Sequence, residues 1–434
     1  MTLVLPDVVE VHSLYQPVVD LMTRSMVGVE ALARGPAGTP FEKPDDLFAA
    51  ARAAGRLREI DWLCRISALR GALAAPLPPG QLLFVNIEPG ATTGPIPREA
   101  DDLIRRAAAM SVVVEITERD LLLNPAALLR AVDRVRSQGW LVAVDDVGAD
   151  TASLALLPFL EPDVIKLAMS FTQSRAADDT ASVISAVAAE SGRTGARVLA
   201  EGIETEHHLG LALDMGASLG QGFLFGEPAP LPRRAPDAID AVTSPDTSPD
   251  TSPDTAPVGT AVGITVRGRP GGTPFTIGAA SGRVQRADGE LVVSLSRQLE
   301  RQAVAMGPST IVVMSIPFLF PLDAGAIDGA RGVARSGALV SVFGRDAHRA
   351  ALPSLPNLRT LDVSPDDPIA DEFTLIVVSP HLTAGLLSRV VVDGPAPGFD
   401  YRLTYDRTVV LDAASYLLDR TSAAPSMFGP AVNG

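Results

Sequence analysis

Acidic and amide side chains stand at the ends of several short apolar runs in the first half of the chain. Two adjacent aspartates, Asp145 and Asp146, follow the run Leu141–Val144, and Lys166 lies at the end of another run. Further run ends carry Glu30, Asn86, Glu115, Glu201, Glu204 and Gln221. Carboxylates that gather at one place repel one another unless cations bind between them. The residue types therefore predict a cation site where these runs end.

The donor atoms of this set indicate which cation it holds. No histidine falls at one of these run ends, and the single cysteine, Cys64, lies in a helical stretch. Oxygen and amide donors favour Mg²⁺ or Mn²⁺ over zinc. Two such ions roughly 3.5–4 Å apart can polarise a water, grip the non-bridging oxygens of a phosphodiester and stabilise its leaving alkoxide. A nearby lysine can hold the water and a spare carboxylate can act as base, so the set predicts phosphodiester hydrolysis at a two-metal site.

The runs that must bring these residues together alternate with helical stretches. The predicted strands are Val8–Val19, Ser25–Leu32, Leu82–Ile87, Val112–Ile116, Leu141–Val147, Val164–Leu167, Val198–Glu201 and Ala217–Phe223. The predicted helices are Phe41–Ala54, Leu57–Leu73, Glu99–Ala109, Pro125–Gln138 and Thr180–Thr194. Alternation repeated this often predicts parallel strands with helical crossovers, and a count approaching eight suits a (β/α)-barrel. Chemistry in such barrels lies at the carboxyl ends of the strands, which is where we expect Glu30 and the other candidates.

The same residues form an ordered series of motifs that resembles the EAL-domain family of cyclic diguanylate (cyclic di-GMP) phosphodiesterases. The motifs are YQPVVD at 15–20, EALAR at 30–34, FVNI at 84–87, EITE at 115–118, DDVG at 145–148, VIKL at 164–167, AEGIET at 200–205 and QGF at 221–223. Each motif alone is weak evidence for the family. Together, in the order of the family and at fitting intervals, the motifs span nearly the whole of residues 9–235. The resemblance implies a TIM-like (β/α)8 barrel whose first strand is antiparallel. It also implies metal-dependent hydrolysis of cyclic di-GMP to linear pGpG.

The resemblance further assigns a role to each candidate residue. The implied ligands of a first metal are Glu30, Asn86, Glu115 and Asp145, and a second metal falls to Asp146. The implied catalytic residues are Lys166, Glu201 and Asp146, with Lys166 contacting the attacking water or a neighbour of the metal site. The implied substrate-binding residues are Gln16, Arg34 and Gln221, with Arg34 meeting a ligand phosphate. Glu204 is implied to hold the loop that follows Asp146.

Two positions depart from the pattern of that family. Where the family has an acidic residue two positions after the lysine, this chain has Ala168. The loop at 147–153 (VGADTAS) also lacks a glycine and an aromatic residue. Losing a group that supports a metal ligand typically weakens metal binding by about 10–100-fold. The sequence thus leaves two interpretations open: an active phosphodiesterase, or a catalytically impaired domain that acts as a cyclic di-GMP receptor or signalling scaffold.

A tetrapeptide repeat, TSPDTSPDTSPDTAP at residues 243–257, divides the chain. Proline and aspartate leave nothing there to bury, so the repeat predicts a tether between two folded units at residues 1–240 and 260–425. In the second unit we expect helices at Ser294–Met306, Gly325–Ser336 and Asp412–Arg420, and strands at Thr310–Ser315, Leu339–Phe343 and Phe373–Ser379. Its segments 296–301, 342–344 and 401–406 resemble the DICT sensory domain, which implies a smaller mixed α/β domain that regulates the first.

The net charge and the hydropathy of the chain limit the expected cellular location of the protein and the classes of partner that it can bind. A formal net charge of −15 argues against a nucleic acid polymer as partner. A bound metal can still reverse the field locally for a phosphorylated ligand. The longest apolar run, near Ser309–Leu322, is short and contains prolines, so we expect no membrane span, and the N-terminus shows no secretory signal. We therefore expect a cytoplasmic protein that binds cyclic di-GMP. A homodimer through the barrel and a ligand or protein partner of the second unit stay open.

Overall fold

The computed structural model describes residues 5–6, 9–88, 91, 95–117, 124–173, 178–232, 271–320, 324–337, 339–349, 355–393 and 397–421. The repeat at 243–257, which the sequence predicts to be a tether, lies outside these described residues. The limits of the two units at 1–240 and 260–425 therefore stay predictions.

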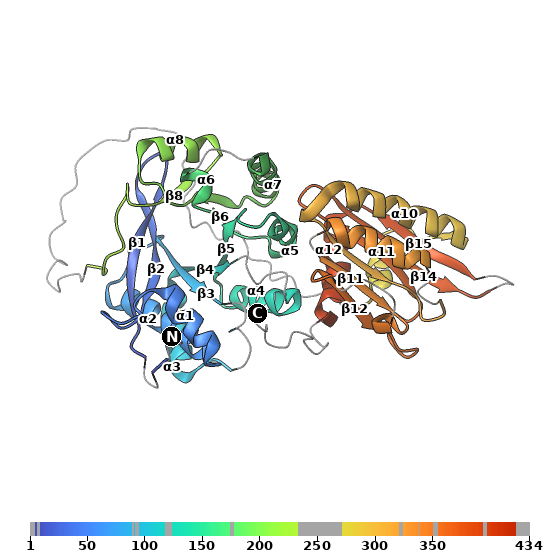
Figure 1. Ribbon diagram of the computed structural model, residues 1–434, viewed down its shortest axis with the longest axis horizontal. Helices are drawn as coiled ribbons and strands as arrows, with labels where there is room; N and C mark the ends of the chain where they lie inside the picture. The colour runs from blue at the N-terminus through green and yellow to red at the C-terminus, as the bar shows by residue number, and fades with distance from the viewer. Residues whose placement is uncertain are drawn as a thin grey trace, which may run out of the picture. The chain divides into compact units, whose positions relative to one another are not determined.

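Eight strands close into a barrel in chain order (Figure 1). They are β1 (His12–Asp20), β2 (Met26–Arg34), β3 (Leu82–Ile87), β4 (Ser111–Thr117), β5 (Leu141–Val147), β6 (Val164–Leu167), β7 (Arg197–Ala200) and β8 (Leu219–Gln221). Strand β1 pairs antiparallel with both β2 and β8, whereas β2–β3, β3–β4 and β5–β6 are parallel. The predicted TIM-like barrel with an antiparallel first strand is confirmed.

Helices cover the outside of the barrel (Figure 1). They are α1 (Pro44–Ala53), α2 (Leu57–Ala74), α3 (Arg98–Arg106), α4 (Pro125–Ser137), α5 (Leu157–Leu160), α6 (Ser170–Gln173), α7 (Asp178–Thr194) and α8 (Glu206–Asp214). Helix α1 begins at Pro44, later than predicted, because proline fits the first helical position, where its missing N–H needs no partner. Helix α2 buries several apolar side chains, including Ile60 and Leu69, and Ile60 lies in a core cluster with Leu47 and Ala51 of α1.

A seven-stranded mixed sheet forms separately, in the order β12-β11-β10-β13-β14-β15-β9. Its strands are β9 (Gln285–Ala287), β10 (Ile311–Ser315), β11 (Leu339–Gly344), β12 (Leu358–Asp362), β13 (Glu372–Val378), β14 (Thr383–Val391) and β15 (Gly398–Thr404). Its helices are α9 (Pro274–Ala280), α10 (Gly289–Met306), α11 (Ala324–Ser336) and α12 (Arg407–Arg420). The expected second mixed α/β unit is thus present, and β10, β11 and β13 lie where predicted.

Both faces of this sheet are covered by helices. One face packs Val312 and Leu375 into a core with Leu299 of α10 and Val333 of α11. Leu386 of β14 also belongs to this core. Because side chains alternate along a strand, the residues before and after Leu386 lie on the other face of the sheet. There Leu387 and Gly385 of β14 lie against Gly278 of α9 and Val410 of α12. The sheet is therefore the middle layer of three.

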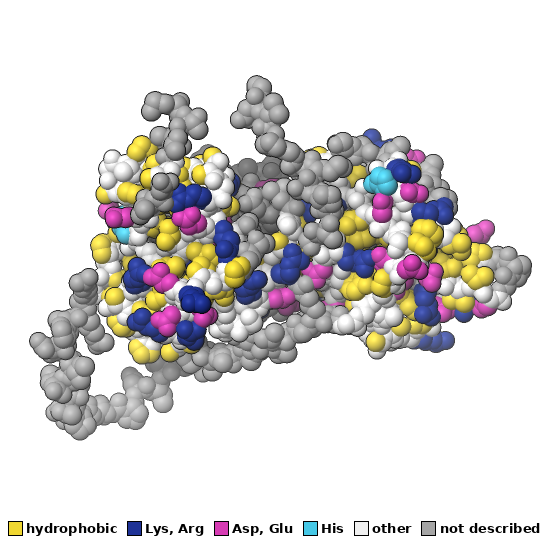
Figure 2. Space-filling model, turned by 90° about the horizontal axis from the view of Figure 1, so that it is seen from below, with side chains coloured by type: hydrophobic (Ala, Val, Ile, Leu, Met, Phe, Trp, Pro, Cys, Tyr) yellow, Lys and Arg dark blue, Asp and Glu magenta, His cyan; other side chains and the backbone are white. Residues whose placement is uncertain are grey.

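One face of the described residues carries mixed charges, and no described helix could span a membrane. On the face shown in Figure 2, Lys and Arg side chains lie interspersed with Asp and Glu. Among the described helices, none combines the length and the apolar character needed to cross a bilayer.

Candidate active site

A β-bulge at the end of β5 brings two consecutive aspartates to one side. Val144 lies opposite Ile165 and Val147 opposite Leu167, so β5 has one residue more than β6 between these pairs. Asp146 has a φ of 58°, in the left-handed region that aspartate adopts more readily than most residues. Consecutive residues of a regular strand would point to opposite faces, and the bulge removes that alternation. The side chains of Asp145 and Asp146 can therefore serve the same site.

Glu201 is placed by the turn that follows β7. The N–H of Ile203 donates to the carbonyl oxygen of Gln221 at 3.0 Å, and the N–H of Leu224 donates to the carbonyl oxygen of Ile203 at 3.0 Å. A Cβ on Gly222 would lie 2.2 Å from the Ile203 carbonyl oxygen, so only glycine permits this approach. The segment that carries Glu201 is thereby fixed against the end of β8.

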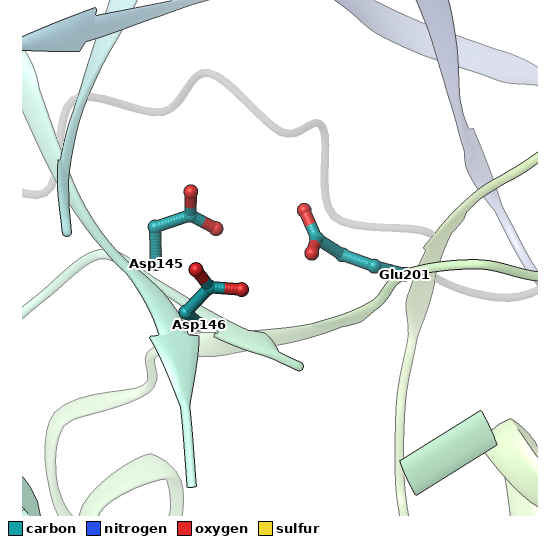
Figure 3. A group of neighbouring side chains, drawn as sticks. All are labelled: Asp145, Asp146 and Glu201. Carbon is teal, nitrogen blue, oxygen red and sulfur yellow. The ribbon is translucent and has the colours of Figure 1, made fainter. Parts of the chain in front are cut away.

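These three carboxylates form one cluster. Asp145, Asp146 and Glu201 each offer an oxygen atom within 4.8 Å of the others, and all three side chains are partly buried. Figure 3 shows the aspartates pointing from the end of β5 toward Glu201, which reaches in from the far side. Like charges this close destabilise the fold unless a cation or a proton lies between them.

Lys166 lies beside the cluster. Its Nζ is 3.0 Å from Asp145 Oδ1, and the side chain is only 1% exposed. It lies on β6, next to the bulged strand, and its ammonium offsets one of the cluster's three negative charges. Lysine that is nearly inaccessible to water is rare unless its charge is paired, and Asp145 supplies the opposite charge here.

A second set of candidates is joined by side-chain hydrogen bonds around Glu30. Asn86 Nδ2 donates to Glu30 Oε1 at 3.0 Å, and Gln221 Nε2 donates to Glu30 Oε2 at 2.7 Å. Gln221 Nε2 also lies 3.1 Å from Gln16 Oε1, and Gln16 Nε2 donates to the Gly226 carbonyl oxygen at 3.1 Å. Strand pairing explains the set, since Gln16 lies opposite Glu30 and Val18 opposite Gln221.

One detail of the sequence interpretation is wrong here. Glu30 does not end its strand, because β2 continues to Arg34. The antiparallel partner β1 keeps pairing with it as far as His12, opposite Arg34. Glu30 is therefore buried inside a long hairpin, with its carboxylate directed to the neighbouring strands rather than to solvent.

The remaining candidates lie in different surroundings. Glu115 is fully buried and lies opposite Asn86 in the β3–β4 pairing. Arg34 donates from Nη1 to the carbonyl oxygen of Ala33 at 2.8 Å. Glu204 is exposed before α8, and its N–H donates to His208 Nδ1 at 3.3 Å. The phosphate contact of Arg34 and the loop contact of Glu204 stay predictions.

The two departures noted in the sequence both lie next to the bulge. Ala168 is buried, and its N–H donates to the carbonyl oxygen of Val147 at 3.3 Å. Gly148 has a φ of 98°, and a Cβ on it would lie 2.6 Å from the Phe171 ring. Asp150 then caps the short turn Thr151–Leu156 by accepting from the Ala152 N–H at 2.9 Å. The position of the missing acidic residue thus adjoins the acidic cluster.

The donor set fits a divalent cation that prefers oxygen. The clustered groups are all carboxylates, and the neighbouring set adds another carboxylate and amide groups. Such donors suit Mg²⁺ or Mn²⁺. The sequence motifs contain the residues that the structure brings together here. They do not predict the bulge, whose signal is only a pair of aspartates followed by valine and glycine, and they do not include Asp61.

Comparisons with known proteins identify the family of the barrel. The model of the EAL domain matches residues 7–228. A cyclic di-GMP phosphodiesterase of Pseudomonas aeruginosa is 31% identical over 236 residues, which cover 52% of this chain and 39% of that protein. The probable cyclic di-GMP phosphodiesterase PdeB of Escherichia coli is 29% identical over 222 residues, covering 50% and 42%. This chain therefore spans less than half the length of these two relatives.

Solved structures also resemble part of the chain. One is BlrP1 of Klebsiella pneumoniae in complex with calcium and cyclic di-GMP, with 27% sequence identity and a TM-score of 0.45. That similarity covers 50% of this chain and 56% of the other. A manganese complex of the same protein at pH 9.0 has the same identity and TM-score, and covers 53% and 58%.

Proposed function

The chain belongs to the EAL-domain family, and on that premise we propose that its barrel hydrolyses cyclic di-GMP to linear pGpG with a divalent metal. The observation that carries the proposal is the carboxylate cluster of Asp145, Asp146 and Glu201 beside the buried ion pair of Lys166 with Asp145. Two relatives with this activity in their names, one of them as probable, match over about half of the chain.

The metal would be Mg²⁺ or Mn²⁺, held in a two-metal site. Its ligands would come from Asp145, Asp146 and Glu201 together with the neighbouring Glu30, Asn86 and Glu115. When bound, such an ion polarises the phosphodiester and lowers the pKa of water. The amide of Asn86 suits this role because its nitrogen donates to Glu30, which leaves the side-chain oxygen to face another partner.

The reaction adds one water across one phosphodiester of the ring. The water oxygen forms a bond to phosphorus, the bond from phosphorus to the 3′ oxygen breaks, and the ring opens. Lys166 would hold the water by a hydrogen bond, since its contact with Asp145 keeps the Nζ group in place. Glu201 or Asp146 would accept the water proton, and the leaving oxygen would take up a proton as it departs. This accounts for all atoms in the linear product.

The substrate would be held by groups around the hairpin. Gln16 and Gln221 lie on adjacent strands, and their amides are oriented by one another and by Glu30. Amide side chains offer both donors and acceptors, as a nucleobase or sugar requires. Arg34, at the end of β2, would meet a phosphate, which guanidinium groups bind well.

The second sheet would regulate the barrel. Its DICT-like character, inferred from the sequence, is part of this proposal, as is a sensory ligand or protein partner. Homodimerisation through the barrel and a cytoplasmic location stay predictions.

Incubation of the full chain with cyclic di-GMP, with and without Mg²⁺ or Mn²⁺, tests the proposal. Metal-dependent appearance of pGpG on chromatography is the expected result. Binding of cyclic di-GMP without product would instead identify the impaired receptor that Ala168 leaves open. Failure to bind the nucleotide at all would contradict both.

A further inference from the structure

A buried aspartate outside the acidic cluster reaches the end of the strand that carries Asn86. Asp61 lies on α2 and is 1% exposed. Its Oδ1 accepts a hydrogen bond from the backbone N–H of Glu88 at 2.8 Å. Glu88 is the second residue after Asn86 and directly follows β3. The Asp61 carboxylate therefore ties an outer helix to the carboxyl end of a barrel strand.

The other oxygen of Asp61 is held by an arginine one helical turn away. Arg65 Nε donates to Asp61 Oδ2 at 2.7 Å, and its Nη2 contacts the same oxygen. The Arg65 guanidinium lies 4.0 Å from the centre of the Trp62 ring, which fixes it further. Burial raises the pKa of the Asp61 carboxyl, while Arg65 and the Glu88 N–H lower it. One oxygen of Asp61 is thus held by Arg65 on the same helix, and the other binds the backbone N–H that follows β3.

The burial of this ion pair needs a reason other than stability. Moving a charged pair out of water has a high desolvation penalty, and apolar residues of similar volume often give an equally stable or more stable fold. The bond to Glu88 supplies a reason, because an apolar side chain could not accept from that N–H. What the ion pair adds is therefore a fixed position for the backbone after β3.

We propose that Asp61 is a positioning residue for the metal site. By holding the Glu88 N–H it fixes the end of β3, and through β3 it directs Asn86 at Glu30, whose Oε1 lies 3.0 Å from Asn86 Nδ2. The inference rests on the function proposed above. A displacement of about 1 Å in a reacting group can lower the rate roughly 100-fold, so a modest shift of β3 is enough to matter.

The test is Mn²⁺ binding to the full chain, measured by calorimetry, alongside turnover. Asp61→Ala should weaken Mn²⁺ binding by about 10–100-fold and lower kcat, with little change in KM. Asp61→Asn keeps an oxygen for the Glu88 N–H and should restore most of the affinity. Leu69→Ala is the matched control, because it removes another buried side chain of α2 and so also lowers stability, while it leaves the Asp61 carboxylate and the Glu88 N–H in place.

A second pair of variants tests the hydrogen bond itself and does not depend on Asp61→Ala folding. Glu88→Ala and Glu88→Pro both remove the ion pair of Glu88 with Arg52. Only proline also removes the N–H that Asp61 binds. Glu88→Pro should therefore weaken Mn²⁺ binding as Asp61→Ala does, while Glu88→Ala should bind Mn²⁺ like the unchanged chain.

The outcomes separate this inference from the proposed function. If the unchanged chain binds Mn²⁺ and makes pGpG but Asp61→Ala and Glu88→Pro bind the ion equally well, the positioning role is wrong and the proposed function stands. Equal weakening by Leu69→Ala would also overturn it, since the effect would then follow stability alone. If the unchanged chain neither binds Mn²⁺ nor turns over, the proposed function fails and the inference fails with it.

Discussion

At the scale of single residues, Glu30 joins two other candidate residues of the site through its two carboxylate oxygens. One oxygen accepts a hydrogen bond from Asn86 on β3, the neighbour of β2, and the other accepts from Gln221 on β8, the neighbour of β1. The side chain is buried, so removing it leaves two amide groups without the acceptor that they share. A buried donor that loses its partner costs about 1–3 kcal/mol, and here the loss also releases a candidate metal ligand, Asn86, and a candidate substrate-binding residue, Gln221.

Glu30→Ala should therefore abolish turnover while the barrel stays folded. The measurement is pGpG formation, with a circular dichroism melt as the check on folding. Glu30→Gln is the matched control for shape, since it keeps the volume and one acceptor but loses the charge that a metal requires. Full activity in Glu30→Ala would contradict the site as described here.

Ala168 offers a gain-of-function test at the same scale. It is buried beside the bulge that carries Asp145 and Asp146, where its methyl group provides no ligand. Ala168→Asp should tighten Mn²⁺ binding, by about 10-fold or more, because a carboxylate would then support the cluster. Without metal the same variant should melt at a lower temperature, since another negative charge is buried there. Ala168→Asn controls for size. Unchanged Mn²⁺ affinity in Ala168→Asp would show that this position does not face the metal site.

At the scale of elements, helix α9 is attached to the second sheet by a buried carboxylate. Glu372 on β13 accepts from the N–H of Phe275 at 2.9 Å and from the Thr273 hydroxyl. Arg389 lies nearby, with its guanidinium 4.6 Å from the Phe275 ring. Burial raises the pKa of Glu372 to about 7, against which the two hydrogen bonds and Arg389 act. The Glu372 carboxyl group that attaches α9 therefore gains or loses its proton near neutral pH.

This raised pKa gives a pH dependence with a defined sign. The folded protein holds the proton more tightly than the unfolded chain, whose ordinary carboxyl pKa is 4.5. The contribution of Glu372 is fully present below pH 4.5 and is lost as the pH rises through about 7. The second sheet should thus become more stable on acidification across this range, by about 1–3 kcal/mol.

Hydrogen exchange of residues 273–280 in the full chain, corrected for the intrinsic pH dependence of exchange, measures the effect. Protection should increase from pH 7.5 to pH 5 and should change much less in Glu372→Gln, which carries no titrating group. Equal pH dependence in both proteins would assign the change to other groups.

How accurately the sequence predicts a helix or strand depends on whether local sequence or contact with distant segments determines it. Strands such as β4 and β6 are buried runs with strong apolar character, and their positions follow from composition. The sequence interpretation assigned no strand to β14 or β15. Strand β15 begins with glycine and has Asp400 in its interior, both poor strand formers, and its pairing with β14 decides its structure. Likewise, α12 begins at Arg407, five residues earlier than predicted, because Asp406 caps it by accepting from the Val409 N–H at 3.2 Å.

The site shows the same division between local and tertiary information. The motifs supply the candidate residues, each of which lies at or near the end of an apolar run. They do not predict that Asp145 and Asp146 point the same way, since this requires a register shift against β6. Nor do they predict that Glu30 is buried inside β2, because its surroundings come from β1, β3 and β8. Packing between distant segments decides both.

At the scale of the whole molecule, the excess of acidic residues makes stability depend on cations. The formal net charge is −15, and three carboxylates lie together at the barrel end. Binding of a ligand to the folded state alone raises stability, by about 2.7 kcal/mol at a concentration 100 times its Kd. Mg²⁺ or Mn²⁺ should therefore raise the melting temperature of the full chain.

Thermal melts with and without each ion, at constant ionic strength, measure this. Asp146→Asn is a suitable control, because it removes one carboxylate of the cluster but can still adopt the left-handed conformation observed at φ 58°. Its melting temperature should respond less to the ions. A melt of the unchanged chain that neither ion shifts would count against the metal site.

The closure of the barrel between its first and last strands sets an order of events during synthesis. Strand β1 pairs with β8 at Val18 opposite Gln221, so one side of β1 lacks its partner until the ribosome has added the intervening residues. At 5–20 residues per second this takes roughly 10–40 s. An unpaired strand edge recruits other chains, and proline is one device that discourages this. Pro17, in the middle of β1, has no backbone N–H and therefore interrupts the row of hydrogen-bond donors on β1 before β8 is made. The nascent chain thus carries its own protection against misassembly until its last barrel strand emerges.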